Sequence, residues 1–501
     1  MKLFETAQIK EIDQYTIEHE PISSPDLMER AGTRMTKRIM SSFNVNIPFW
    51  IVAGPGNNGG DGLVIARLLV KGGYNVTVCM LRFTDKISED CQLNLDRYND
   101  TEGKVIDIKS AEDVPEIPEK AVIVDAVFGA VLTRPVKGLP GEVIAKINQI
   151  KARKVAIDIP SGLFGEDNSK NTGEIFKADD TLTVQFPKRS FFFKENRKYT
   201  GEVHVIDIGL HPDAIAQTES TWYVNTESAV KKCVRTRGIF DHKGHFGHAL
   251  LIAGSYGKMG AAVLAAKACL RAGVGLLTVH VPKTGYQILQ QAVPEAMLSI
   301  DASDLIFTAC DDSSDFNVFG IGPGLDKKPN TKKALADLIQ RTDKPMVLDA
   351  DALNIIAKNK SLLNKLPANS VLTPHPKEFE RLFGKSNYAW AEAELQLKMA
   401  VKYNLVIIVK GAFTRIATPK GTLYINITGN PGMATAGTGD VLTGIVLSLL
   451  AQGYDAVTAS RLAVFVHGKA GDAFVEDNSQ EALIAGDIPV YLGRIFKKLK
   501  Q

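Results

Sequence analysis

Along most of the chain, short apolar runs alternate with longer stretches in which apolar residues recur every three or four positions. The short runs are typical of buried strands and the longer ones of amphipathic helices. In the first half, the pattern predicts one or two helices over residues 4–43, strands at 49–53, 75–81, 121–126, 154–158, 180–186 and 202–208, and helices at 61–71, 88–98 and 141–151. Strands that alternate with helices predict a mainly parallel sheet covered on both faces, and therefore an α/β fold.

A second alternating series follows a polar segment, residues 211–227, which has no clear period. It comprises strands at 249–253, 276–281, 317–321, 345–348 and 405–409, a β-rich stretch at 413–427, and helices at 260–272, 331–341 and 441–452. A chain of 501 residues can hold two or three domains, and each half is long enough to bury its own core. The sequence predicts one domain over residues 1–218 and another over residues 223–501.

Composition and charge narrow the class of protein. Hydrophobic residues make up 45% and charged residues 23% of the chain, as in ordinary soluble proteins. The net charge of +3 is too small to indicate a nucleic-acid or membrane partner. The five cysteines form no CxxC, which favours a reducing compartment. Residues 1–20 do not resemble a signal peptide, and no apolar run approaches the roughly 18 residues of a membrane span. We expect a cytoplasmic protein.

The stretch NPGMATAGTGDVLTG, residues 430–444, carries the most specific chemistry in the second half. Its glycines let the backbone approach a ligand closely, and the free N–H groups of the helix that follows favour an anion. Asp440 falls in the first turn of that helix, where it is a candidate base for a substrate hydroxyl. The alternative is a glycine-rich loop with an acid that suits the helix dipole. No lysine follows the glycines as in a P-loop.

A glycine-rich turn also follows the first predicted strand, where AGPGNNGGDG occupies residues 53–62. Such a turn places backbone N–H groups at the carboxyl edge of a parallel sheet, where doubly wound folds bind ligands. Two later strands end in Asp125 and Asp158, and Ser161 follows the second of them. Oxygen atoms of Asn58, Asp125 and Ser161 would suit a hard cation, although a strand-end Asp is as often a helix cap.

Other motifs of the second half stand at predicted strand ends or helix starts. They are GAA at 260–262, FGIGPGL at 319–325, LDADALN at 348–354, LTPHPKEFERL at 372–382 and VIIVKGAFT at 406–414. Lys410 could meet a nucleotide phosphate or be a solvated lysine, and His375 could bind a ligand or be structural. His242, His245 and His248 lie in a probable glycine loop without Cys or carboxylate at ligand spacing, so a metal site there is rejected.

The glycine motif and the strand-end aspartates resemble the epimerase domain of the NAD(P)H-hydrate repair enzymes over about residues 9–213. The resemblance implies a Rossmann-like three-layer fold. It also implies that Asn58, Asp125 and Ser161 hold potassium and that Asp158, in contact with substrate, is the acid/base. The implied substrate contacts are Asn57, Asn58, Gly59, Gly60 and Asp61, with a second loop of Gly129, Ala130, Val131, Leu132, Thr133, Arg134 and Pro135. Ala130 and Val131 depart from the family's usual Thr-Gly pair.

The motifs of the second half, in this order, resemble the ribokinase-like fold and, within it, the ADP/ATP-dependent NAD(P)H-hydrate dehydratases, over about residues 223–499. The resemblance implies that the hydrate is bound by Ala262, Gly324, His375 and Asp440, and the adenine nucleotide by Lys410, Gly411, Ala412, Phe413, Thr414 and Gly439. Asp440 would be the catalytic base and magnesium would accompany the nucleotide. Ala352 replaces a usual Gly, and Phe413 occupies a variable place.

The whole chain therefore resembles the bifunctional repair enzymes, which epimerise the R and S hydrates of NADH and NADPH and dehydrate the S hydrate. ADP is the expected co-substrate, with ATP as the alternative, and a homo-oligomer is expected. One alternative is a ribokinase-like kinase for a vitamin or sugar alcohol fused to a nucleotide-binding domain. Another is a non-catalytic adaptor that binds nucleotide or RNA, against which the two strand-end aspartates and the lack of a basic cluster argue.

Overall fold

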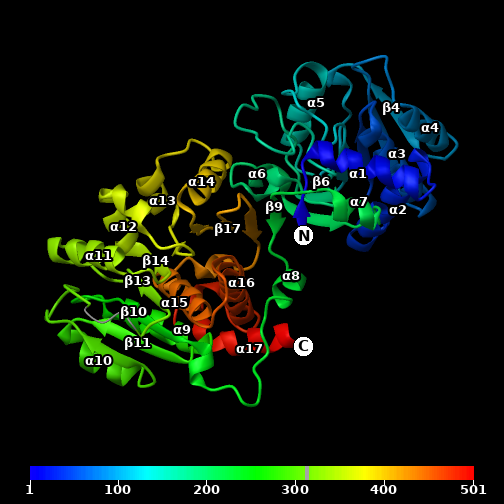
Figure 1. Cartoon of the computed structure of the whole chain (residues 1–501). Helices are drawn as coiled ribbons and strands as arrows, with labels where there is room; N and C mark the ends of the chain where they lie inside the picture. The colour runs from blue at the N-terminus through cyan, green and yellow to red at the C-terminus, as the bar shows by residue number, and fades with distance from the viewer. Residues whose placement is uncertain (311–314) are drawn as a thin grey trace. The chain divides into compact units, whose positions relative to one another are not determined.

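The computed structural model describes residues 1–310 and 315–501 (Figure 1). It forms two compact units. The first unit comprises Leu3–Ser220 and Tyr388–Trp390, and the second comprises Met1–Lys2, Thr221–Asn387 and Ala391–Gln501. Among the described residues, no helix has the length and apolar character needed to cross a membrane. Each unit contains one sheet, so the predicted α/β class is confirmed.

The first unit is built on a seven-stranded, wholly parallel sheet in the order β4-β3-β2-β5-β6-β7-β8. Its strands are β2 (Phe49–Ala53), β3 (Val76–Leu81), β4 (Lys104–Ile108), β5 (Val122–Ala126), β6 (Arg153–Ile157), β7 (Asp180–Val184) and β8 (Glu202–Ile206). Its helices are α1 (Thr6–His19), α2 (Ser24–Ser42), α3 (Asn57–Lys71), α4 (Glu89–Asn99), α5 (Gly138–Gln149), α6 (Arg197–Thr200) and α7 (Pro212–Gln217).

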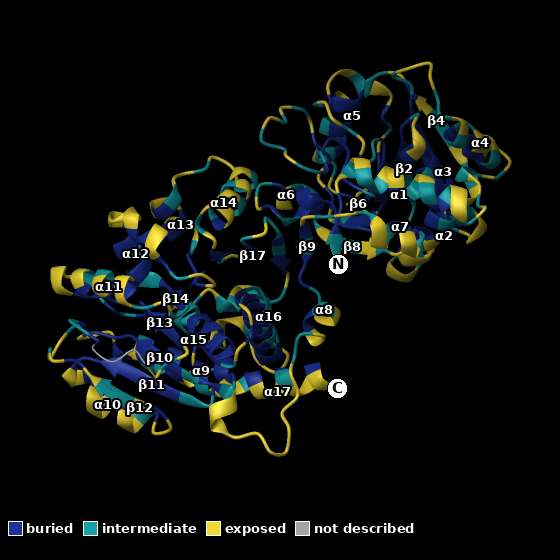
Figure 2. Cartoon of the chain, in the orientation of Figure 1, coloured by how far each residue is buried: buried dark blue, intermediate teal, exposed yellow. Residues whose placement is uncertain are grey.

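Alternate residues of the central strands enter two different cores. Ile51 of β2 packs with residues of α1 to α4, whereas its neighbour Val52 packs with residues of α5. Since successive side chains of a strand point to opposite faces, this sheet is covered on both sides. The dark strands between partly exposed helices in Figure 2 show the same three-layer arrangement, which is the Rossmann-like architecture expected from the sequence.

The second unit has an eleven-stranded sheet in the order β1-β9-β18-β17-β16-β15-β14-β13-β10-β11-β12. The strands from β16 to β12 in this order are parallel, whereas β17 is antiparallel to both of its neighbours. They are β1 (Lys2–Leu3), β9 (Trp222–Val224), β10 (His248–Ile252), β11 (Leu276–Val281), β12 (Met297–Ile300), β13 (Val318–Ile321), β14 (Met346–Leu348), β15 (Val371–Leu372), β16 (Val406–Val409), β17 (Thr414–Ala417) and β18 (Leu423–Asn426).

The α-helices of the second unit are α8 (Glu227–Lys231), α9 (Met259–Arg271), α10 (Tyr286–Ala292), α11 (Pro329–Arg341), α12 (Ala350–Lys358), α13 (Pro376–Phe383), α14 (Ala389–Tyr403), α15 (Thr438–Ala451), α16 (Ala456–Val475) and α17 (Ile488–Lys500). Helices α9 and α15 approach so closely that a Cβ on Gly444 would lie 2.1 Å from the carbonyl oxygen of Ala265. The alanine-rich helix α9 is therefore a packing element, and it fixes the position of the helix that carries Asp440.

Several boundaries differ from those that the sequence pattern predicts. Helix α3 begins at Asn57 instead of residue 61, because the glycines of the turn are already helical after the N-cap Gly56. Strand β4 and helices α12, α13 and α14 were not predicted, since they are short, partly polar or begin at Pro or Ala. The segment 211–227 was expected to be irregular, but it contains α7, β9 and the first residue of α8, and the boundary between units falls at Ser220 and Thr221.

Candidate functional site

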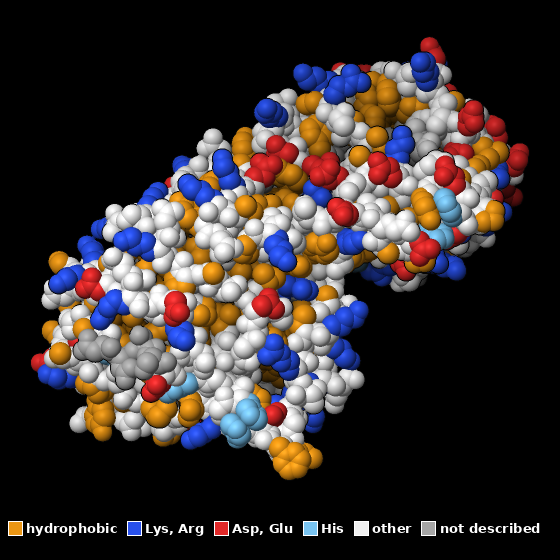
Figure 3. All heavy atoms as spheres, in the orientation of Figure 1, with side chains coloured by type: hydrophobic (Ala, Val, Ile, Leu, Met, Phe, Trp, Pro, Cys, Tyr) orange, Lys and Arg blue, Asp and Glu red, His pale blue; other side chains and the backbone are white. Residues whose placement is uncertain are grey.

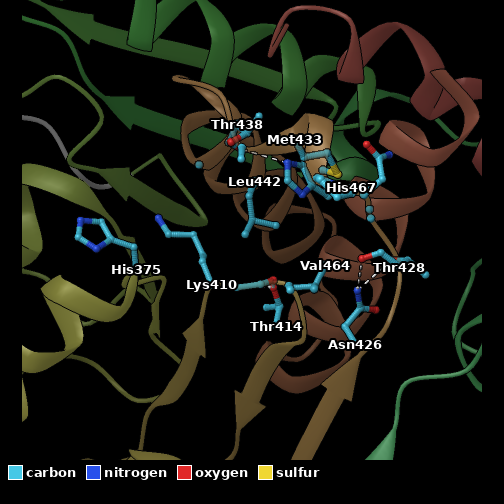
Figure 4. A pocket seen from close by; sticks show the side chains of 18 residues that line it. His375, Lys410, Thr414, Asn426, Thr428, Met433, Thr438, Leu442, Val464 and His467 are labelled. Carbon is cyan, nitrogen blue, oxygen red and sulfur yellow. Dashed lines mark hydrogen bonds between the residues drawn. The ribbon is translucent and has the colours of Figure 1, made fainter. Parts of the chain in front are cut away.

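A cavity of 640 Å³ opens at the start of α15 in the second unit (Figure 4). Of the residues predicted to hold the nucleotide, Lys410, Gly411, Ala412, Thr414 and Gly439 line it, whereas Phe413 does not. The loop before α15 and helix α16 contribute the rest of the wall, which includes Asn426, Thr428, Met433, Val464 and His467. The motifs at 406–414 and 430–444 therefore meet around one cavity, with polar groups and an apolar wall.

Lys410 is held at this cavity by a buried aspartate that the sequence analysis did not single out. Its Nζ donates to Asp349 Oδ1 at 2.7 Å, and Thr443 Oγ1 donates to Asp349 Oδ2 at 2.8 Å. Asp349 directly follows β14 and is 1% exposed. A Cβ on Gly439 would lie 3.1 Å from Lys410 Nζ, so a side chain at this position would crowd the ammonium group. The missing side chain keeps the cation accessible at the helix start.

Asp440 lies in the first turn of α15, as the sequence predicted. Burial and the neighbouring carboxylate of Asp349 raise its pKa to about 7, and the cation of Lys410 opposes this shift. Asp351 and Glu378 raise it further. Lys410 is paired with Asp349, so Asp440 is a carboxylate that takes up or releases a proton near neutral pH, as a general base requires.

His375 lines the same cavity and also caps a helix. Its Nδ1 accepts hydrogen bonds from the backbone N–H groups of Lys377 and Glu378, at 3.1 and 3.4 Å. Burial, followed by the nearby Lys410 and Arg381, lowers its pKa. In Figure 4 the side chain of Lys410 extends toward His375 at one side of the cavity. The structural and ligand-binding interpretations of this histidine are therefore compatible.

The other three residues predicted to bind the hydrate, Ala262, Gly324 and Asp440, are not among the residues that line this cavity. Ala262 is fully buried in α9. Gly324 has a left-handed φ of 64°, and a Cβ there would lie 2.7 Å from the carbonyl oxygen of Lys258, just before α9. Ala262 and Gly324 thus lie in tightly packed backbone around the first turns of α9.

His467 was missed by the sequence analysis. It lines the cavity, and Figure 4 shows it beside Thr438, whose carbonyl oxygen lies 3.0 Å from its Nε2. Burial lowers the pKa of His467 to about 4, so the ring is neutral and its N–H can donate to that carbonyl group. Its sequence context, in the middle of an apolar helix, gave no signal for this role.

The first unit has a cavity of 570 Å³ at the carboxyl ends of β2 and β5. Of the predicted substrate residues, Asn57, Asn58, Gly129, Val131 and Leu132 line it. Arg134 and Pro135 line an adjoining cavity, and Gly59, Gly60, Asp61, Ala130, Thr133 and Asp158 line neither of the two. Gly59 serves the turn itself, because a Cβ there would lie 1.8 Å from the carbonyl oxygen of Gly54.

The three predicted cation ligands lie deep beside this cavity. Ser161 donates to both carboxylate oxygens of Asp125, from Oγ at 2.6 Å and from its backbone N–H at 2.7 Å. Burial raises the pKa of Asp125 to about 6 although these hydrogen bonds oppose the shift, and in the described ranges no Lys or Arg pairs with it. Asn58 Nδ2 is buried without a hydrogen-bond partner. The oxygen atoms of Asp125 and Ser161, in a buried site where the described residues supply no cation, would suit a hard monovalent cation.

Asp158 has an unusual backbone and a buried cationic partner. Its φ of 63° is left-handed, a conformation that Asp adopts more readily than most residues. Lys188 Nζ donates to Asp158 Oδ1 at 2.6 Å, and the two side chains are 2% and 17% exposed. The ammonium group also donates to Thr183 Oγ1 and to the carbonyl oxygen of Phe186, both at 3.2 Å. Lys188 therefore fixes this carboxylate after β6.

Two further carboxylates lie close enough to Asp158 to influence its surroundings. Burial and then the charge of Asp158 raise the pKa of Asp13 on α1 to about 7, and Lys188 opposes this shift. Burial and the charges of Asp158, Asp13 and Asp90 raise the pKa of Asp61 well above its usual value. The structure thus brings the predicted Asp61 and Asp158 together with Asp13 and Lys188, which the sequence analysis missed, in a cluster that holds a proton near neutrality.

The histidines rejected as metal ligands have structural contacts. His242 Nδ1 accepts a hydrogen bond from the backbone N–H of Gly244 at 3.1 Å, and His245 Nδ1 lies 3.1 Å from Asp241 Oδ1. His248 Nε2 lies 2.9 Å from Thr278 Oγ1. Each ring therefore has a local role in the loop or in β10.

The second unit has a cavity next to the helix that carries Asp440, and the first unit has a cavity and a cluster of buried carboxylates. Two such regions in two α/β units are typical of an enzyme with two active sites. Residues 24–190 match the family described as the YjeF-related protein N-terminus, and residues 249–492 match the NAD(P)H-hydrate dehydratase family. The chain belongs to the family of bifunctional NAD(P)H-hydrate repair enzymes, because its whole length is 35% identical to 98% of the Nnr enzyme of that name from Moorella thermoacetica. The resemblance noted from the motifs is thereby confirmed.

A second relative agrees with this assignment. The Nnr repair enzyme of Escherichia coli is 32% identical over 94% of this chain and 89% of its own. Among solved structures, the ADP/ATP-dependent NAD(P)H-hydrate dehydratase from Bacillus subtilis, co-crystallised with ATP and Mg²⁺, is 30% identical, with a TM-score of 0.47. The matched region spans 55% of the present chain and 98% of the Bacillus subtilis chain.

Proposed function

We propose that this protein repairs hydrated NADH and NADPH with two active sites. Residues 1–218 would interconvert the R and S hydrates, and residues 223–501 would dehydrate the S hydrate at the expense of ADP, giving AMP and phosphate. The observation that carries the proposal is the pairing of the two sites in one chain of this family, with Asp440 titrating at about 7 beside a nucleotide-sized cavity. A simple kinase fused to a binding domain would not require the carboxylate cluster of the first unit.

In the second unit, Asp440 would take the proton of the C6 hydroxyl group as the oxygen attacks the terminal phosphorus atom of the nucleotide. With ADP, the bond to the bridging oxygen breaks and AMP leaves. The nitrogen lone pair of the ring then expels phosphate from C6, and loss of a proton from C5 restores the reduced nicotinamide. Lys410, Gly411, Ala412, Thr414 and Gly439 would bind the phosphates, and His375 would contact the hydrate.

Magnesium would be held near the acidic residues of this site. The carboxylates of Asp349, Asp351 and Glu378 all act on Asp440, and burial raises the pKa of Glu378. Such a concentration of carboxylates suits a hard divalent cation that accompanies phosphate groups. Bound magnesium would neutralise charge on the transferred phosphoryl group, while Lys410 contributes a fixed positive charge.

In the first unit, the ring nitrogen would expel the C6 hydroxyl group, which leaves as water after taking a proton. Water then returns to either face and gives up a proton. Asp158 would exchange these protons, with Asp13 and Asp61 as neighbouring carboxylates that share them. Asn58, Asp125 and Ser161 would hold potassium, which supports the loop around the substrate and neutralises the buried carboxylate.

The test is to incubate the full chain with a mixture of R and S hydrates of NADH, adding ADP to one sample and ATP to another. The expected result is full recovery of reduced-nicotinamide absorbance, with AMP formed in the ADP sample. No recovery with either nucleotide would overturn the proposal. Recovery with ATP alone would change the co-substrate and leave the reaction class intact.

A homo-oligomer in the cytoplasm is the accompanying proposal. Ile239 and Phe240, which are 95% and 93% exposed, form an apolar pair that a second copy could cover. Light scattering coupled to size exclusion would measure the mass directly, and a monomer at micromolar concentration would contradict this part.

A further inference from the structure

A second cavity of the first unit adjoins the proposed epimerase cavity and is strongly basic. It measures 560 Å³, and both cavities are lined by Phe83, Phe128 and Leu132. The rings of Phe83 and Phe128 lie 5.6 Å apart and form a common wall. A substrate with two ends could therefore occupy both cavities at once.

The charged lining of this second cavity is entirely cationic. Arg82, Lys109, Arg134 and Lys137 line it, and no acidic side chain is among its described lining residues. Arg82 forms an ion pair with Asp107 at 2.8 Å. In the described part of the chain, Lys109, Arg134 and Lys137 form no ion pair. In Figure 3, Lys and Arg side chains lie around an apolar patch between α5 and β4, in the same part of the first unit.

The start of a helix adds to the positive potential that these four side chains create in the cavity. Helix α5 begins at Gly138, and Gly138, Leu139 and Pro140 of its first turn line the cavity. The unpaired N–H groups of a helix start favour an anion, and three cations without carboxylate partners on the same wall suit a dianionic group. A phosphate ester on a ribose is such a group. Its second pKa is about 6, as for other phosphate esters, so it carries between one and two negative charges near neutral pH.

We infer that this basic cavity, lined by Arg82, Lys109, Arg134 and Lys137, binds the 2′-phosphate on the adenosine half of hydrated NADPH, while the hydrated ring occupies the adjoining cavity. The inference rests on the proposed function of the first unit and adds a substrate preference to it. Hydrated NADH has the pyrophosphate and lacks the 2′-phosphate. The first unit therefore prefers the hydrate of NADPH.

The kinetic test uses the full-length double variant Lys109→Ala/Lys137→Ala, with Lys120→Ala as a matched control from an exposed turn outside both cavities. Epimerisation of both hydrates is followed by chromatography without nucleotide. Loss of two charge-assisted contacts should raise KM for the hydrate of NADPH by about tenfold or more and leave KM for the hydrate of NADH unchanged. Equal weakening of both substrates would assign the cavity to the pyrophosphate and overturn the inference, as would no change in either.

A binding test separates this inference from the proposed reaction. Adenosine 2′,5′-bisphosphate and AMP are titrated calorimetrically into the full chain with saturating ADP, which occupies the nucleotide site of the second unit. The parent protein should bind the bisphosphate at least about tenfold more tightly than AMP, and the double variant should lose that difference. Preferential binding in a protein without repair activity would leave this cavity assignment standing while the proposed function fails. Equal affinity for the two probes would overturn the assignment.

Discussion

In each unit a lysine pairs with one aspartate of a group of carboxylates, but the paired aspartate differs in its proposed role. In the second unit Lys410 pairs with Asp349, whereas burial and then the charge of Asp349 raise the pKa of the neighbouring Asp440 to about 7. In the first unit Lys188 pairs with Asp158 itself, and the raised pKa values occur on Asp13 and Asp61. In both units a lysine pairs with one carboxylate while burial raises the pKa of neighbouring carboxylates, so the proposed base of one unit is prepared differently from that of the other.

The largest expected effect is on Asp440→Asn, which keeps the size of the side chain and removes the base. Repair should fall on the order of a thousandfold with either hydrate, whereas interconversion of R and S hydrates should continue. Reduced-nicotinamide absorbance measures the first reaction and chromatography the second. If Asp440→Asn retained more than a tenth of the parent rate, another group would be the base.

The second largest effect is expected from Asp158→Asn, which should slow epimerisation. With a mixture of hydrates and excess ADP, the S fraction should be repaired at the parent rate, and the R fraction should follow on the order of a hundredfold more slowly. The two phases would be visible in one time course. A single fast phase to completion would show that Asp158 is not the acid/base of the epimerase reaction. Asp158 and Asp440 could then no longer be compared as the proton-transfer groups of the two units.

The pH dependence should differ in sign between the two activities. Dehydration requires Asp440 as the carboxylate, so its rate should fall about tenfold per pH unit below about 7 and level off above it. Epimerisation draws a proton from the cluster in which Asp13 has a pKa of about 7, so its rate should decline above that pH. Asp13→Asn should abolish the alkaline decline. If the rates of dehydration and epimerisation changed in the same direction with pH, the carboxylates of the two units would not differ in the protonation state that each reaction requires.

The smallest effect concerns potassium. Asp125→Asn removes the buried charge that would hold the cation and keeps the shape of the side chain. Epimerisation in potassium buffer should slow several-fold and become independent of potassium, while dehydration of pure S hydrate should not change. Replacing potassium by lithium in the parent protein should reproduce the loss. Epimerisation by the parent protein at full rate without potassium would exclude the site.

The strand-and-helix pattern predicted the α/β fold and most elements of both sheets, because buried strands and amphipathic helices leave local periods in the sequence. It did not predict α13, whose first residues Pro376 and Lys377 are polar or cyclic and whose cap is His375. Nor did it predict β4, a partly exposed strand in a charged stretch. Strand β4 buries too little surface to leave a clear pattern, and α13, with eight residues, is too short for its buried Phe379 and Leu382 to establish a period.

The candidate sites were predictable only where several functional residues occur within one motif. Lys410, Gly411 and Gly439 lie in glycine motifs and meet at one cavity. Lys188 stands thirty residues after Asp158, and Asp13 lies in helix α1 near the start of the chain. Only the folded chain brings the three residues together. Asp349 stood within a motif that the sequence analysis noted, but its pairing with Lys410 depends on β14 and β16 ending at the same edge of the sheet, on either side of β15.

The left-handed backbone at Asp158 determines how substitutions there should be interpreted. Asp and Asn enter this region of φ more readily than alanine, for which it costs roughly 1–2 kcal/mol. An alanine scan would therefore combine two losses at this position, that of the carboxylate and that of a relaxed peptide geometry. Asn, Gly and Ala all leave the buried ammonium group of Lys188 without its counter-charge, so that loss is common to every variant at this position. A thermally weakened Asp158→Ala protein would consequently report on the turn as much as on the reaction, and Asn and Gly at this position form the more informative pair.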